Sequence, residues 1–309
     1  MKILDLFCGA GGLSSGFSNE GFKVTGVDIS DKAADSFRLN KLGSFIQADL
    51  SKEIIADGFD VIMGGPPCKP WSAVNVTRRR EKHHDYGLVG RFFKHVEINR
   101  PAFFLFENVP LVANDKILNS HLKRLSGKFG YSIEEEFVTY KDFGAPTRRR
   151  RLIVFGTRTG NSHDFFKLLA KHKTKNKATV RDAIGYLRNS GFGDESDHEW
   201  PRLRTIHNYL KYYKTGQFGW YVLKWREQAP SFGNVMKTYI LHPDSFNGGE
   251  TRAISVKEAL QLMGFPRKYS FPKGEGLGVR YQMVADSVSP VFSRAAAKAM
   301  KALYDGERS

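Results

Sequence analysis

Two cysteines are all that this chain of 309 residues contains, and no apolar stretch approaches the roughly 20 residues that a membrane helix needs. The spacing of Cys8 and Cys68 suits neither a zinc site nor a disulfide framework. The first residues, MKILDLFCGAGG, also lack the basic start, apolar stretch and cleavage site of a secretory signal. These absences predict a protein of the reducing cytoplasm with free thiols, no metal ion and no membrane partner.

Positive charge is what the chain has in excess. Its net charge is +16 and its isoelectric point about 9.7, whereas 41% hydrophobic and 26% charged residues are typical of a globular protein. The basic residues form blocks at 78–80, 148–151 and 167–177. A solvated basic face could account for them, but such blocks are the electrostatic footprint of a polyanion partner. Because no basic amphipathic helix accompanies them, nucleic acid is favoured over a membrane surface.

Short apolar runs alternate with helix-like segments in the first third of the chain. Residues 2–7, 23–29, 44–50 and 59–65 are typical of strands, and residues 13–21 and 32–40 of helices. Two further strands are expected at 102–109 and 150–157. The alternation predicts an α/β fold with a Rossmann-like, doubly wound and mostly parallel sheet. Ligands bind such sheets at the carboxyl ends of the strands.

The pattern changes near residue 157. Residues 158–251 lose the alternation, whereas 254–265 and 287–306 again have helical spacing. The last of these helices has Pro290 near its first turn and Gly306 after its expected end. We therefore predict one large domain made of residues 1–157 and 252–309, with a smaller domain, residues 158–251, inserted into it.

A glycine-rich turn, DLFCGAGG, follows the first expected strand and opens the first helix. Gly9, Gly11 and Gly12 would let the backbone approach a ligand closely, and Asp28 at the end of the second strand could bind ribose hydroxyls. Ser14 stands where the dinucleotide-binding fingerprint has its last glycine. Taken alone, the turn therefore leaves NAD, FAD and no ligand at all as alternatives.

The segment GGPPC, residues 64–68, is more specific. Two prolines fix the backbone just ahead of Cys68, which makes this cysteine either a held nucleophile or a small buried hydrophobe. A nucleophilic thiol needs positive charge or a proton acceptor nearby, because it is mostly protonated at neutral pH. Glu107 ends another strand and could equally be a solvated carboxylate. The arginines at 148–151 could bind phosphate or belong to a solvated turn.

Together these elements resemble the cytosine-5 DNA methyltransferase family, and the resemblance covers nearly the whole chain. Its ordered motifs occur as DLFCGAGGLSSGF, VDI, QADL, GGPPCKPWS, FENV, GAPTRRRRLIVFG, RAISVKEALQLMGFP and RYQMVADSVSP. The resemblance implies S-adenosylmethionine as cofactor, with S-adenosylhomocysteine as product, rather than NAD. Because this cofactor has no phosphate, the glycine turn would make room for its methionine end. The residues implied to bind it are Phe7, Gly9, Gly11, Gly12, Asp28 (ribose), Ile29, Asp49 (adenine amine), Leu50, Pro67, Ser287 and Val288.

The resemblance also implies a mechanism on a flipped-out cytosine. The thiolate of Cys68 would attack C6 and so activate C5 to take the methyl group, while Glu107 holds N3 and the exocyclic amine. Arg149 and Arg151 match two arginines of the family, and Arg151 is the better candidate for contacting the cytosine O2. Loss of the C5 proton would then release Cys68. Double-stranded DNA would be gripped by a loop over residues 69–89, with Ser72, Arg78, Arg79 and Arg80 as contacts.

Four positions depart from the family pattern. Lys69 and Trp71 stand where Gln and Phe are usual, Thr147 replaces a Gln, and Asp286 replaces the Asn of a Gly-Asn pair. None of these departures removes a charge or a nucleophile that the reaction requires. They therefore bear on the geometry of the loop and of the cofactor pocket, and not on the reaction class.

The inserted segment would be the target-recognition domain. Its aromatic and basic residues at 208–214 and 219–226 suit contacts to base edges and phosphates, or they form a small core of their own. Arg252 and Glu258 are expected to brace the two domains against each other.

Two other functions compete with this one. A transfer-RNA methyltransferase of the same family would carry a Cys-Phe-Thr signature after the glutamate motif, but both cysteines precede Glu107. A non-catalytic DNA-binding relative would have no use for Cys68. We therefore predict a monomeric DNA (cytosine-5) methyltransferase that acts at the nucleoid. It would be the modification enzyme of a restriction-modification system, and a cognate endonuclease would act separately.

Overall fold

Seven strands form one sheet in the order β3-β2-β1-β4-β5-β7-β6. Strands β1 to β5 run parallel to one another, whereas β7 runs antiparallel to both β5 and β6. The computed structural model describes residues 1–71, 80–203, 206–216 and 219–306. The strands are β1 (Lys2–Leu6), β2 (Lys23–Asp28), β3 (Ser44–Gln47), β4 (Val61–Gly64), β5 (Phe103–Asn108), β6 (Ser132–Thr139) and β7 (Arg150–Thr157).

Both faces of the sheet are buried, which explains why its central strands are continuous apolar runs. Side chains of a strand point alternately to the two faces. In β5, Phe103 and Leu105 belong to one hydrophobic core, and Phe104 and Phe106 belong to the other. The sequence-based expectation of a mostly parallel, doubly wound sheet is therefore confirmed.

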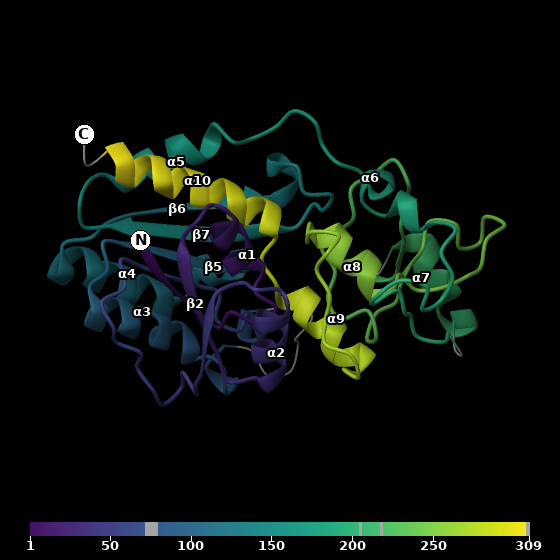
Figure 1. Ribbon diagram of the computed structural model, residues 1–309, viewed down its shortest axis with the longest axis horizontal. Helices are drawn as coiled ribbons and strands as arrows, with labels where there is room; N and C mark the ends of the chain where they lie inside the picture. The colour runs from purple at the N-terminus through teal and green to yellow at the C-terminus, as the bar shows by residue number, and fades with distance from the viewer. Residues whose placement is uncertain (72–79, 204–205, 217–218, 307–309) are drawn as a thin grey trace.

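Helices cover the two faces in separate groups. Helix α10 packs against α1 and α5 on one face, and α3 packs against α4 on the other (Figure 1). Gly16 is required where α1 approaches α10, because a side chain there would collide with the backbone of Ser293 and Arg294. The helices of this part are α1 (Gly12–Asn19), α2 (Asp31–Leu39), α3 (Leu88–Asn99), α4 (Lys116–Phe129), α5 (Ser162–Ala170) and α10 (Pro290–Gly306).

The helices expected from the sequence are present, with one small difference at the end of α10. Helices α1, α2, α8 and α10 lie where the apolar spacing predicted them. Pro290 begins α10 as expected, but Gly306 is its last residue and does not follow its end. Among the described residues, no helix is long and apolar enough to cross a membrane.

A smaller body lies beside the sheet and carries α6, α7 and α8 (Figure 1). Its elements are α6 (Val180–Ile184), α7 (Leu210–Thr215), α8 (Val256–Met263), α9 (Leu277–Asp286), and a two-stranded parallel sheet of β8 (Tyr221–Val222) and β9 (Ile240–Leu241).

The packing of α5 and α8 bears on the position of the boundary between the two bodies. Helix α5 packs on α10, although its residues fall within the segment 158–251, and α8 packs on both α6 and α9. The division at residues 157 and 252 stays a prediction, and this packing favours a first boundary after α5.

Candidate active site

Four parallel strands, β1, β2, β4 and β5, end at the rim of one cavity of about 670 Å³. This is the position in which open α/β sheets bind ligands. Of the site residues that the resemblance implies outside the loop 69–89, all except Gly11 line it. The cavity therefore receives Phe7, Gly9, Gly12, Asp28, Ile29, Asp49, Leu50, Pro67, Cys68, Glu107, Arg149, Arg151, Ser287 and Val288.

Gly11 has a conformational role in the turn. Its φ is +73°, in the left-handed region that favours glycine, and a side chain there would collide with Leu42. It therefore packs toward the interior and away from the cavity. The predicted DNA contacts Ser72, Arg78 and Arg79 lie outside the described residues, and so does the side chain of Arg80.

The glycine turn is tied to the end of β2 by a carboxylate. The backbone N–H groups of Gly9 and Ser30 each donate a hydrogen bond of 3.0 Å to Asp28. Burial raises the pKa of Asp28 above its usual value, and the two N–H donors oppose that rise. Gly12 lets the start of α1 approach the carbonyl of Val288, with which any side chain would collide. The turn thus forms a cavity floor whose acidic group is held by backbone donors.

Cys68 follows β4 on a backbone that is fixed from both sides. The side-chain amide of Asn108 donates to the carbonyl of Pro66 at 3.0 Å, and the N–H of Trp71 donates to the carbonyl of Cys68 at 3.0 Å. The thiol is half-buried. Burial and the charge of Asp286 raise its pKa, and Arg151 and Arg149 partly offset this. The cysteine is therefore held in place and is protonated at neutral pH in this state.

Glu107 lies beside Cys68 in a buried ion pair. The Nε atom of Arg151 is 3.0 Å from Glu107 Oε1, and the hydroxyl of Tyr140 donates to the same oxygen at 2.9 Å. Both members of the pair are less than a tenth exposed. Gly65 keeps the approach to the carboxylate open, since a side chain there would come within 2.9 Å of Glu107 Oε2. The second carboxylate oxygen thus faces the loop that holds Cys68.

The antiparallel direction of β7 brings the arginines to this place. Register pairs Glu107 with Ile153 and Asn108 with Leu152, so the first residues of β7 lie next to the last residues of β5. The sequence predicted this strand but not its direction. A parallel strand would have carried Arg151 to the opposite edge of the sheet.

Arg149 differs from Arg151 in what it contacts. It is 4% exposed, and it donates to the carbonyls of Ala285 at 2.6 Å and of Phe232 at 3.4 Å. Burial, with a smaller effect from Arg151, lowers its pKa to about 10, so it stays charged at neutral pH. These contacts join β7 to the segments around 232 and 285. Arg149 therefore positions these segments, and Arg151 is the arginine paired with the acid of the site.

Sequence reasoning missed Tyr140 and Asp115. Tyr140 follows β6, which the sequence did not predict, and only the folded chain brings it to Glu107. Asp115 is the N-cap of α4, and its side chain accepts from the N–H of Ile117. An aspartate just ahead of a helix is an N-cap signal that the sequence itself contains. Asp115 also accepts from the indole N–H of Trp71 and from the hydroxyl of Tyr86, both at 2.7 Å.

The hydrogen bond to Asp115 accounts for Trp71, one of the four departures, because phenylalanine could not donate it. Thr147 forms an isolated parallel bridge with Ala229 and so attaches the arginine segment to the smaller body. Lys69 and Asp286 both line the cavity. The departures thus lie at the site or at its supports.

Replacing Trp71 with phenylalanine is expected to lower the free energy of unfolding by about 1–3 kcal/mol, because a buried carboxylate loses a donor. Chemical denaturation of both proteins measures this difference. Trp225→Phe is the matched control, since its acceptor Asp244 is more exposed and keeps a bidentate pair with Arg188. Equal losses in the two variants would contradict the anchoring role of Asp115.

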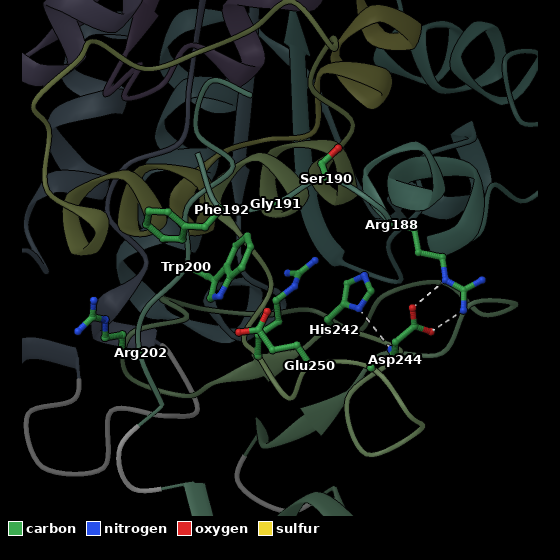
Figure 2. Close-up of a pocket in the computed structure, with 11 residues that line it drawn as sticks. Arg188, Ser190, Gly191, Phe192, Trp200, Arg202, His242, Asp244 and Glu250 are labelled. Atoms are coloured by element: carbon green, nitrogen blue, oxygen red, sulfur yellow. Dashed lines mark hydrogen bonds and ion pairs between the residues drawn. The ribbon is translucent and has the colours of Figure 1, made fainter. Parts of the chain in front are cut away.

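A second cavity, of about 440 Å³, lies in the smaller body (Figure 2). Arg188 holds Asp244 in a bidentate ion pair at its edge. Arg252 holds Glu258 through two hydrogen bonds of 2.8 and 2.7 Å and lies over the ring of Trp200 at 4.3 Å. Arg252 and Glu258 therefore pair with each other and join α8 to the segment before it, and their expected role of bracing the two domains stays a prediction.

His242 stands at the centre of this second cavity. The N–H of Asp244 donates to its Nδ1 at 3.3 Å (Figure 2), and burial lowers its pKa to about 4. The ring is therefore neutral at physiological pH and carries its proton on Nε2. Glu258 lies 3.6 Å from that nitrogen, beyond hydrogen-bond distance.

Aromatic residues of the smaller body form a half-buried cluster. Tyr209 stacks on Trp220 with centroids 4.2 Å apart, and Tyr213 and Tyr239 pack against the same indole at 5.5 and 5.8 Å. The packing role considered for these side chains is therefore observed, and their contact with DNA stays a prediction.

One group of potential metal ligands occurs in the described part of the chain, at His83, His84 and Asp85. Its members already contact one another. The Nε2 atom of His84 lies 3.1 Å from Asp85 Oδ1, and the backbone N–H of Asp85 donates to His83 Nδ1 at 3.1 Å. The expectation that no metal is needed stays a prediction.

Comparison with known proteins places these features in context. The sequence model described as C-5 cytosine-specific DNA methylase matches residues 1–302. The type II methylase M.HgiDII of Herpetosiphon aurantiacus is 26% identical, over 98% of this chain and 96% of its own length. The type II methyltransferase M1.HphI of Haemophilus parahaemolyticus is 27% identical, over 99% and 88%.

Solved structures show the same fold. The S. pombe Dnmt2 methyltransferase superposes with a TM-score of 0.73 at 16% identity, and covers 100% of both chains. The Entamoeba histolytica methyltransferase EhMeth gives 0.71 at 17% identity, over 99% of this chain and 98% of that one.

Proposed function

This chain belongs to the C-5 cytosine-specific DNA methylase family, and from that membership we propose that Cys68 is the nucleophile with which it methylates cytosine in DNA. The observation that carries this assignment is the meeting of a held cysteine with the Glu107–Arg151 pair on one cavity. A cysteine that served only packing would not need an ionised acid and base at its side. The reaction is the transfer of a methyl group to cytosine C5.

We propose that the part of this cavity near β1 and β2 holds S-adenosylmethionine. Its walls carry the carboxylates of Asp28 and Asp49 and the apolar side chains of Phe7 and Ile29, and the space beside Gly9 is open. Acidic groups suit ribose hydroxyls and an adenine amine, and they repel phosphate, so the donor set fits this cofactor better than a dinucleotide. When bound, the cofactor supplies an electrophilic methyl group and leaves as S-adenosylhomocysteine. Gly12, Leu50, Pro67, Ser287 and Val288 would complete the contacts.

The residues around Cys68 suit a covalent mechanism on the base. The Cys68 thiol would give its proton to water and the sulfur would bond to cytosine C6, which moves electron density to C5. Glu107, once protonated, would donate to N3 while its other oxygen accepts from the exocyclic amine, and Arg151 would face the O2 atom, so both stabilise the negative charge that develops on the ring. After C5 has been methylated, its proton would pass to water, and the electrons of that C–H bond would break the C6–sulfur bond and release the Cys68 thiolate. Arg149 would act by positioning the segments around 232 and 285.

The base must leave the duplex to reach this buried group. We propose that Ser72, Arg78, Arg79 and Arg80 contact the DNA from the loop after Cys68, and that the smaller body reads the sequence. Among the arginines of the second cavity, Arg188 and Arg252 hold carboxylates. Arg202 is exposed and pairs with no carboxylate in the described part of the chain, so it suits a phosphate or a base edge.

The biological setting follows from the relatives. Type II methyltransferases protect DNA from a companion endonuclease, and we propose that this chain is the modification enzyme of such a system. It would act as a monomer on genomic DNA at the nucleoid, with the endonuclease working separately.

Expression in a bacterial host without cytosine methylation tests the function. Bisulfite sequencing is expected to find protected cytosines in one short sequence context, and none in cells that carry an empty vector. Protection would identify the recognition sequence directly. Soluble protein that binds S-adenosylmethionine but protects no DNA would contradict the function, and methylation of transfer RNA in the same cells would establish the RNA alternative.

A further inference from the structure

The last residue of α9, Asp286, places an extra carboxylate on the wall of the main cavity. Both of its oxygens accept from the side-chain amide of Gln282 at 2.9 Å. The side chain is exposed, and no lysine, arginine or histidine of the described residues pairs with it. The pattern that the chain resembles has a neutral asparagine here, so Asp286 departs from it by one negative charge.

Two of the other acids on this cavity, Glu107 and Asp49, have a compensating cation, whereas Asp28 accepts from backbone N–H groups. Glu107 is paired with Arg151 at 3.0 Å, and Asp49 is paired with Lys52 at 3.1 Å. Asp286 is held by a neutral amide instead, so its charge acts on the cavity without compensation.

The field of this carboxylate reaches two groups of the site. It raises the pKa of the Cys68 thiol, second only to burial, and it has a smaller raising effect on the pKa of Asp28 at the end of β2. Cys68 and Asp28, which lie at the ends of β4 and β2, line the same cavity as Asp286. A positive charge bound between them would therefore lie within reach of Asp286.

We propose that Asp286 selects between the methyl donor and its product by charge. The donor is a sulfonium and carries one more positive charge than the product, which is a neutral thioether at the same sulfur. An uncompensated carboxylate on the cavity wall stabilises the first ligand more than the second, whatever other contacts they share. Asp286 therefore reduces product inhibition. This inference rests on the proposed function, because it requires the cavity to bind S-adenosylmethionine.

The negative charge of Asp286 also acts on Cys68. A carboxylate that favours a bound cation also disfavours the thiolate, so the empty site keeps the cysteine protonated and unreactive. A bound sulfonium offsets that effect. The asparagine of the family would provide neither the selection nor the protection of the thiol.

Titration calorimetry without DNA tests the inference on binding alone. The affinity ratio of S-adenosylmethionine to S-adenosylhomocysteine is expected to fall about 3- to 10-fold in Asp286→Asn, which keeps the shape and removes one charge. Asp286→Glu keeps the charge and is expected to retain a ratio near that of the wild type. Asp164→Asn on α5 is the control for a change in net charge, because Asp164 lies away from the cavity.

The outcomes separate the two proposals. Failure of the wild-type protein to bind either ligand would contradict the proposed function itself. Normal binding of both ligands, with an unchanged ratio in Asp286→Asn, would overturn the role of Asp286 and leave the function intact. An equal fall in Asp164→Asn would also overturn it, since the effect would then come from net charge.

Discussion

Replacing Cys68 with serine is expected to reduce the rate of methyl transfer by about 10⁴-fold or more, because an alcohol is a far weaker nucleophile than a thiolate. Two carboxylates act on Cys68 through their charge, and each already has a partner. Glu107 is occupied by Arg151 and Tyr140, and Asp286 accepts from Gln282. Single-turnover transfer from radiolabelled S-adenosylmethionine to duplex DNA measures the loss.

Binding measurements on the same variant separate chemistry from folding. Cys68→Ser should bind S-adenosylmethionine as the wild type does, since Cys68 is not among the groups proposed to hold the cofactor and serine has nearly the same size. DNA with 5-fluorocytosine at the target adds a second test. Fluorine cannot leave C5 as the proton does, so the adduct with the enzyme should persist on a denaturing gel. Cys8→Ser removes the other thiol and should still form the adduct, and an adduct with Cys68→Ser would contradict the assignment.

Most of the strands and the site at their ends could be predicted from the sequence because both depend on local patterns. Each apolar run is long enough for one strand, and a polar residue follows it at the carboxyl end. Cys68 and Glu107 end neighbouring strands β4 and β5, so a parallel sheet necessarily brings them together. The family motifs then identified which of these residues carry chemistry.

What the sequence did not predict depends on tertiary contacts. The direction of β7 is set by its pairing with β6, a strand rich in glutamate that has no clear apolar pattern. That direction decides which arginine meets Glu107. Arg149 and Arg151 are the same residue type two positions apart, so the sequence does not distinguish their contacts. In the fold, Arg149 donates to backbone carbonyls and Arg151 pairs with Glu107.

The role of the aromatic segments at 208–214 and 219–226 also could not be decided from the sequence. Tyrosine and tryptophan interleaved with lysine are compatible with DNA contact or with packing, because both roles use the same side chains. The centroid distances around Trp220 show that these rings pack on one another. Aliphatic side chains of this body, such as Ile184, Leu187 and Val235, are fully buried, so the half-buried rings lie at the margin of its core.

Replacing Glu107 with glutamine is expected to lower the rate of methyl transfer by about 10²–10³-fold, the usual effect of removing one charge-stabilising group. Glutamine keeps the size of the side chain and an oxygen that can accept from Tyr140, but it removes the charge that faces Arg151. Arg151 and Arg149 would then lie together without a counter-charge, and the buried pair would be broken. Hence the variant should also unfold at a lower temperature than the wild type.

Two measurements keep the catalytic loss apart from the loss of stability. Single-turnover rates taken well below the unfolding temperature of Glu107→Gln report the chemistry alone. Glu136→Gln, on the edge strand β6, changes an acid to an amide away from the cavity and should keep the wild-type rate. If Glu107→Gln lost stability but kept its rate, Glu107 would be only the counter-ion that holds Arg151 in place. If it lost its rate at a temperature where it is fully folded, the carboxylate acts on the base itself, as its open side toward Cys68 indicates.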